Sequence, residues 1–310
     1  MPNLLNRRQM LTASGLVGLG GLSALAACTR RGTPEEATMS PAPTAPGSQP
    51  PGAPTATVPV GFVGHGAPTL ALDATKGADL ARWAADWPAV KAILVVSAHW
   101  EAAPASLGAT QPVPLIYDFS GFPRPLYQLT YPAPGAPALA ERVAALLGGA
   151  VRRAPERGLD HGAWVPLIWL RPAADLPVLQ LSLPGADARV LFDLGRRLAP
   201  LRREGVLVLG SGNVVHNLRR VDFRPDAPTP AWAEDFDAWV AERLSTGDVD
   251  GLLQYGGRPD ARIAHPTVEH FSPLLVAAGA AWGEGGGDAV RFPVTGFEFG
   301  SIARRVVQFG

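Results

Sequence analysis

Short apolar runs alternate with helical periodicity along the chain from residue 58 onward. Residues 58–63, 92–96, 177–183 and 206–209 are rich in Val, Ile and Leu and lack a regular polar alternation. Runs of this length and composition are typical of strands that are buried on both faces. The pattern therefore predicts the core of a largely parallel sheet.

The segments between these runs show the spacing of amphipathic helices. Residues 137–147 place Leu139 and Val143 on one helical face, and residues 187–198 continue similarly. An apolar, aromatic stripe follows on a helix from about residue 232 to 244. Alternating strands and helices predict an α/β fold, namely a three-layer α/β/α sandwich around a largely parallel, mixed sheet.

The first 57 residues carry a different kind of pattern. Arg7 and Arg8 precede an uncharged, apolar stretch over residues 11–27, as in a twin-arginine signal, and the sequence LAAC ending at Cys28 looks like a bacterial lipobox. Residues 1–28 are thus predicted to export the protein through the twin-arginine (Tat) pathway as a periplasmic, cell-envelope lipoprotein, anchored to the membrane through Cys28. An ordinary anchor helix with an incidental cysteine is the alternative.

The remaining chain divides into a tether and one domain. Residues 29–57 are rich in proline and contain no aromatic residue, which predicts a flexible tether. Residues 58–310 are long enough for a single catalytic domain with a large core. The formal net charge is zero and no basic block is present, so the composition argues against a nucleic-acid partner and favours a small molecule.

Histidines mark the candidate chemistry. Cys28 is the only cysteine, so metal ligation in the domain falls to His, Asp and Glu. Of the six histidines, five stand in glycine-flanked or turn-like contexts: His65, His99, His161, His216 and His270. The first, second and fourth of these follow predicted strands. Carboxyl ends of parallel strands share one sheet edge, so we expect a metal centre there, although any single histidine could instead be structural.

Seven motifs occur in a fixed order over residues 58–301. They are GHGAP (64–68), ILVVSAHW (93–100), YDFSGFP (117–123), YPAPG (131–135), LDHG (159–162), GSGNVVHN (210–217) and PTVEHF (266–271). Together they resemble the class III extradiol ring-cleavage dioxygenases, specifically the DOPA 4,5-dioxygenase branch, which is related to the catalytic subunit of protocatechuate ring-opening dioxygenases.

This resemblance implies one divalent metal that a catechol chelates through its adjacent oxygens, with O2 as co-substrate. Fe(II) is expected in the active enzyme, and Zn(II) also suits imidazole ligands. By carry-over the metal ligands are His65, His99, His216 and His270, with Glu269 in reserve for the last. His161 is expected to be the catalytic acid/base, and His216 is the alternative base.

The resemblance also points to residues that bind substrate. Tyr117 stands where relatives often carry histidine, so the loop holding Tyr117 and Asp118 is expected to accept a ring substituent different from that of DOPA. Arg124 is the candidate partner of a substrate carboxylate, or else a solvated surface arginine. His265 is expected to orient the His270 loop.

A second function remains compatible with these residues. An all-histidine shell is neutral and offsets less of the metal charge than a carboxylate would, so it strongly lowers the pKa of a bound water. The alternative to a dioxygenase is therefore a zinc-dependent hydrolase, or a non-redox metal-binding envelope lipoprotein, on the same fold. The sequence gives no indication of the oligomeric state.

Overall fold

The computed structural model describes residues 57–224, 226–283 and 287–310. The predicted signal at 1–28, with Cys28, and all of the predicted tether except residue 57 lie outside the described residues. Within the described part, no helix combines the length and the apolar character needed to cross a membrane.

A mixed sheet forms the centre of the domain. In the described residues its strand order is β4-β3-β5-β2-β6-β1-β10-β7, and β5, β2, β6 and β1 are mutually parallel. β10 runs antiparallel to β1, and β3 antiparallel to β5. The strands are β1 (Val60–Gly64), β2 (Ala92–Glu101), β3 (Ser106–Leu107), β4 (Arg152–Arg153), β5 (Val178–Leu183), β6 (Val206–Gly212), β7 (Val290–Arg291) and β10 (Val306–Phe309). A separate hairpin joins β8 (Phe297–Glu298) to β9 (Ile302–Ala303).

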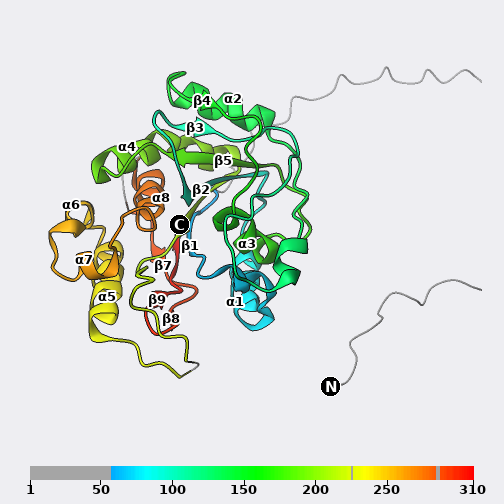
Figure 1. The fold of residues 1–310 in the computed structure, drawn as a ribbon. Helices are drawn as coiled ribbons and strands as arrows, with labels where there is room; N and C mark the ends of the chain where they lie inside the picture. The colour runs from blue at the N-terminus through cyan, green and yellow to red at the C-terminus, as the bar shows by residue number, and fades with distance from the viewer. Residues whose placement is uncertain (1–56, 225, 284–286) are drawn as a thin grey trace, which may run out of the picture. The chain divides into compact units, whose positions relative to one another are not determined.

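Helices cover both faces of this sheet. Figure 1 shows α4 and α8 on one side of the sheet and α1 and α3 on the other. The α-helices are α1 (Ala74–Ala85), α2 (Pro137–Leu146), α3 (His161–Leu170), α4 (Ala188–Leu198), α5 (Ala231–Thr246), α6 (Val249–Leu253), α7 (Ala261–Ala264) and α8 (Ser272–Trp282), with short 3-10 turns η1 (Pro68–Leu72), η2 (Arg124–Gln128), η3 (Ala199–Glu204) and η4 (Tyr255–Gly257). The predicted three-layer α/β/α architecture is confirmed.

The strands divide their side chains between two cores. On β2, Leu94 and Val96 belong to the core beneath α4 and α8, whereas Ile93 and Val95 belong to the core beneath α1 and α3. All four side chains are fully buried. Successive side chains of a strand point to opposite faces, so a central strand covered by helices on both sides must be apolar throughout. This is why the sequence shows continuous apolar runs.

Two details differ from the sequence prediction. The strand predicted over residues 92–96 continues to Glu101, with a shift in its register against β5 after Val96, so His99 lies within β2. The strand continues because Ser97 pairs with Ser211 of β6, which itself runs to Gly212. Apolar content alone therefore ended both predicted strands too early.

The second difference concerns His161, which the sequence placed in a turn. It is the first residue of α3, and the Asp160 side chain caps this helix by accepting from Ala163 N at 3.3 Å. The helix was not predicted because it is buried on almost every side and so shows no amphipathic stripe.

Candidate metal centre

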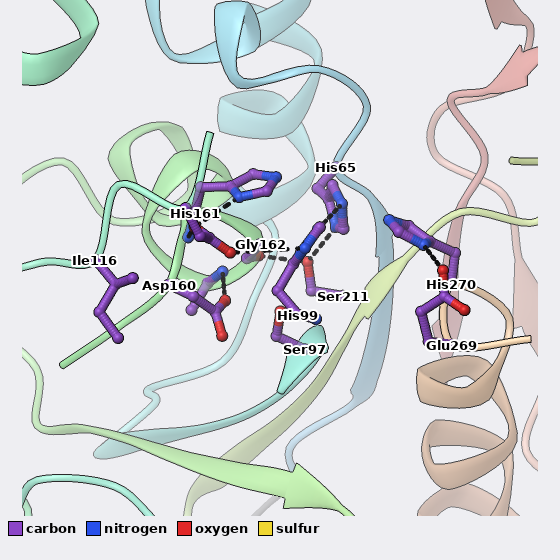
Figure 2. A network of polar contacts seen from close by, with 12 residues as sticks. His65, Ser97, His99, Ile116, Asp160, His161, Gly162, Ser211, Glu269 and His270 are labelled. Carbon is purple, nitrogen blue, oxygen red and sulfur yellow. Dashed lines mark hydrogen bonds and ion pairs between the residues drawn. The ribbon is translucent and has the colours of Figure 1, made fainter. Parts of the chain in front are cut away.

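Five imidazoles from distant parts of the chain meet at the carboxyl edge of the parallel strands. His65 Nε2 lies 3.1 Å from His99 Nε2, and the His99 ring centroid is 3.9 Å from that of His161. His270 lies 5.4 Å from His65 between centroids, and His216 stacks on His270 at 3.5 Å. Figure 2 shows the side chains of His65, His99, His161 and His270 gathered around one region. The convergence expected from the sequence is therefore present.

Backbone hydrogen bonds fix the segments that carry these rings. His65 follows β1, and its N–H donates to Gly212 O at 3.0 Å, which joins the ends of β1 and β6. The N–H of Asn213 donates to His270 O at 2.9 Å, which ties the segment before α8 to the same strand end. His216 N donates to Ala264 O at 3.0 Å. Strand ends thus hold three ring-bearing segments in register.

The hydrogen bonds at Nδ1 define the tautomers of two rings. The Ser211 hydroxyl donates to Gly162 O, so at His65 Nδ1, 3.0 Å away, it acts as acceptor. The Nδ1–H of His270 donates to Glu269 Oε1 at 3.0 Å. With the proton on Nδ1, the lone pair of each neutral ring is on Nε2, which is the arrangement that supports metal binding.

Asp118 makes the corresponding bond to His161. Its Oδ1 accepts from His161 Nδ1 at 2.8 Å and from the His161 backbone N–H at 3.1 Å, while its Oδ2 lies 3.6 Å from His99 Nδ1. Burial by itself would raise the pKa of Asp118, but the bonds from His161 outweigh burial and lower it to about 2. Asp118 is therefore an ionised acceptor that holds the orientation of the His161 ring.

The environment keeps the other imidazoles neutral. Burial lowers the pKa of His65 well below its usual value, and repulsion from His99 lowers it further. Burial, followed by repulsion from neighbouring rings, lowers the pKa of His99 to about 2 and that of His216 to about 3. Protonated rings this close would repel one another, whereas neutral rings can all offer a lone pair to one cation.

The donor set fits a divalent metal ion. Metal bonds of about 2.0–2.1 Å from imidazole place neighbouring ligand nitrogens roughly 3.0–3.4 Å apart, and the His65–His99 separation of 3.1 Å falls in this range. Ligand atoms of His65, His99 and His161 lie within 4.8 Å of one another, as do those of His216, Glu269 and His270. Neutral imidazoles suit Fe(II), Zn(II) and related ions.

A cavity of about 620 Å³ opens onto the imidazoles. All five histidines and Asp118 line it, together with a largely apolar wall. This volume lies within the roughly 300–1,000 Å³ of sites that enclose small organic ligands. The metal-binding arrangement therefore stands at the wall of a chamber that a substituted aromatic ring can enter.

Comparison with known proteins identifies the family. The model of the catalytic LigB subunit of aromatic ring-opening dioxygenase matches residues 71–298. This chain belongs to that family. The match includes four of the clustered histidines, and His65 lies just before it.

Named relatives of this LigB-family chain agree with the assignment. The 4,5-DOPA dioxygenase extradiol of Beta vulgaris is 43% identical over 232 residues, which are 71% of this chain and 85% of the relative. The protein of that name from Escherichia coli K12 is 40% identical over 260 residues, 82% of this chain and 95% of the relative. A crystal structure of an uncharacterized Escherichia coli K12 protein superposes with a TM-score of 0.70 at 36% identity, covering 82% of this chain and all of the other.

Other residues singled out from the sequence of this LigB-family chain lie around the site. Tyr117 does not line the cavity; its hydroxyl donates to Leu129 O at 2.5 Å. Arg124 is exposed at the start of η2 and also lies outside the cavity wall. His265 is buried, with Nε2 bonded to Val214 O at 2.6 Å. Glu269, the reserve ligand, bonds His270 Nδ1.

The sequence analysis of this LigB-family chain missed two kinds of functional position. Ser211, which fixes the His65 tautomer, stood inside a quoted motif but carried no signal of its own. Gly162 followed His161 in another motif; a Cβ there would lie 2.8 Å from His99 Cδ2, so only glycine fits. The apolar side chains that complete the cavity come from loops without periodicity and were not found at all.

Proposed function

We propose that this protein is a metal-dependent extradiol dioxygenase that inserts O2 into a small catechol and opens its ring. The observation that carries the proposal is the pair of facing imidazoles, His65 and His99, with the Asp118–His161 pair beside it in a substrate-sized cavity. The family membership and the names of the relatives support the same reaction.

In this proposal, His65, His99, His216 and His270 hold one divalent metal. Bound Fe(II) would supply the redox chemistry by which electron density of a catecholate reaches O2. Zn(II) suits the same imidazoles and is the redox-inert alternative. The protein contributes neutral, preoriented donors, because Ser211 and Glu269 hold protons of His65 and His270 on Nδ1.

His161 acts as the acid/base in this proposal. Its Nδ1 is engaged by Asp118, which leaves Nε2 to accept a proton from a catechol hydroxyl and to return it after ring opening. Both atoms of O2 enter the ring-opened product, so the overall reaction consumes no external reductant. The apolar wall excludes water from the reacting groups.

The test is a comparison of metals and substrates. Protein loaded anaerobically with Fe(II) should consume O2 and form a yellow ring-opened semialdehyde when a catechol and air are added. The Zn(II)-loaded protein should bind the catechol without consuming O2. A His161→Ala variant with full metal content should lose activity by about 10²-fold or more.

One result would reverse the proposal. If no catechol in a panel supports O2 uptake by the Fe(II) protein, and the Zn(II) protein hydrolyses esters or amides, the site is hydrolytic. The neutral donor set is the feature that would favour such chemistry, because it leaves the metal charge uncompensated and acidifies a bound water.

A further inference from the structure

The cavity wall opposite in chemical character to the imidazoles is strongly apolar. Apart from the histidines, Asp118 and Thr69, its side chains carry no polar group, and the largest are Phe119, Phe122, Leu218, Val221, Phe223 and Phe299. They come from the segment before η2, from the loop after β6 and from the β8–β9 turn. Three segments distant in sequence thus supply one hydrophobic wall.

Two aromatic pairs stand out in this wall. Phe119 packs edge-on against Phe122 with centroids 5.4 Å apart, and also against the His161 ring at 5.6 Å. Phe223 and Phe299 lie 5.2 Å apart. The first pair therefore connects the acid/base histidine to the apolar wall, and the second brings the β6 loop and the β8–β9 turn together.

Part of this wall is left uncovered in the free protein. Phe223 is 73% exposed and Leu218 is 66% exposed, the two highest values among the large hydrophobic residues described. Exposing large apolar side chains beside a cavity is unfavourable unless a ligand or partner covers them. Both line the cavity, so a substrate substituent that reaches the wall would cover them.

Phe299 adds a backbone observation. Its φ is 51°, in the left-handed region that a bulky residue rarely adopts. The conformation is held between β8 and β9, where it places the aromatic side chain in the cavity wall. Strain of this kind is retained mainly where the side chain has a task.

The charges around the cavity disfavour an amino-acid substituent. Among the described residues, no Lys or Arg lines the cavity. The nearby Lys76 is paired with Glu298 at 2.6 Å, and Arg157 is paired with Asp160 at 3.1 Å. A substrate carboxylate would therefore lose water without gaining a cationic partner from the wall.

The ammonium of such a substrate would fare little better. Asp118 is the only carboxylate of the described cavity wall, and its Oδ1 already accepts two bonds from His161. Drawing Asp118 toward a substrate ammonium would release the ring that moves the proton. A zwitterionic side chain thus has no favourable place beside the reacting ring.

We infer that the substrate is a catechol with an uncharged, apolar ring substituent, alkyl or aryl, and not a zwitterionic amino acid. This inference rests on the proposed function. The catechol oxygens face the imidazoles, and the substituent lies against Leu218, Phe223 and Phe299. Phe223 is the residue that selects this substituent.

Binding to the Zn(II)-loaded protein tests the inference without turnover. In calorimetric titrations we expect 4-tert-butylcatechol to bind at least about tenfold more tightly than L-DOPA, since burying a few methyl groups in an apolar pocket supplies a factor of about 10–200. The Fe(II) protein should show the same order in kcat/KM.

Variants of Phe223 show whether the wall makes the choice. Phe223→Ala should weaken 4-tert-butylcatechol binding by about five- to tenfold and leave unsubstituted catechol nearly unchanged. Phe223→Arg should shift the preference toward L-DOPA by adding a cation. Val190→Arg is the matched control, because Val190 is 52% exposed on α4 and does not line this cavity.

The outcomes separate the two proposals. L-DOPA binding as tightly as 4-tert-butylcatechol overturns the inference, above all if Arg219→Gln or Arg220→Gln weakens L-DOPA, because these exposed residues flank the wall in sequence. Equal loss of all three catechols in Phe223→Ala also overturns it. If the binding preference holds but no catechol consumes O2 with Fe(II), the dioxygenase proposal fails while the apolar preference of the cavity stands.

Discussion

The Asp118–His161 pair shows how one side chain sets the behaviour of another. A carboxylate on Nδ1 fixes the tautomer of the ring, presents Nε2 to a substrate and stabilises the imidazolium that forms when Nε2 takes a proton. The additional bond from the His161 backbone N–H means that the same carboxylate holds both the ring and the start of α3. Asp118 is therefore a positioning residue.

Replacing Asp118 tests this role. Asp118→Asn should lower kcat for catechol cleavage by about 10²-fold, because the amide stabilises the protonated ring poorly and can favour the wrong tautomer. KM and metal content should change little. Steady-state kinetics with metal analysis provide the measurement.

Tyr117→Phe is the control for this prediction, since Tyr117 is adjacent but bonds Leu129 O and lies outside the cavity wall. It should leave kcat nearly unchanged. A raised KM with an intact kcat in Asp118→Asn would instead support the substrate-binding role that the sequence suggested.

At the residue scale, the sequence was informative where chemistry is rare. Histidine beside glycine after an apolar run is an uncommon pattern, and it located His65, His99 and His216 before any coordinates. It could not show that Asp118 faces His161, 43 positions away. That contact depends on the path of the long segment between β3 and β4, which has no periodic pattern.

Among the elements, β10 and α5 are joined by a buried ion pair. Arg305 Nε donates to Asp237 Oδ1 at 2.8 Å, and a second nitrogen donates to Oδ2. Both residues are buried, and the guanidinium also lies 4.7 Å from the Phe292 ring centroid. A buried guanidinium without its carboxylate is costly, so this pair should matter more than a surface pair.

Removing one partner should expose that cost. Asp237→Ala should lower the free energy of unfolding by about 3–5 kcal/mol, because it leaves a buried, unpaired charge. Chemical denaturation of the whole chain measures the change. The double variant Asp237→Leu with Arg305→Met should recover most of the loss.

The exposed pair of Arg142 and Glu204 provides the comparison, and Arg142→Met should not change the unfolding midpoint measurably. A midpoint for Asp237→Ala equal to that of the parent chain would show that the ion pair does not hold β10 and α5 together.

The elements that the sequence predicted are those with enough residues to show a period. The parallel strands and the helices near residues 137, 187 and 232 were found because burial imposes their patterns. Strands of two residues, such as β3 and β4, carry no such pattern and pair only because the surrounding chain brings them to the sheet edge.

For the whole molecule, we propose export to the cell envelope through the twin-arginine pathway, with lipid attachment at Cys28. The proposal depends on Arg7, Arg8 and the LAAC sequence, which lie outside the described residues. Export of a folded protein would allow metal loading before the membrane is crossed.

Conservative changes in the signal test this route. Arg7→Lys with Arg8→Lys preserves the charge but alters the motif, so the protein should accumulate in the cytoplasm as an unprocessed precursor. Cell fractionation and immunoblotting supply the measurement. Arg30→Lys with Arg31→Lys is the control and should fractionate normally. Normal envelope localisation of the Arg7 and Arg8 variant would contradict the proposed pathway.

The left-handed backbone at Phe299 sets two demands against each other. A glycine there would relieve roughly 1–2 kcal/mol of local strain, yet it would remove the ring that packs against Phe223. Sequences chosen only for thermal robustness would therefore tend to discard this phenylalanine, and the enlarged entrance would admit bulkier and more polar aromatics. The turn between β8 and β9 is thus a natural place to broaden what the protein accepts.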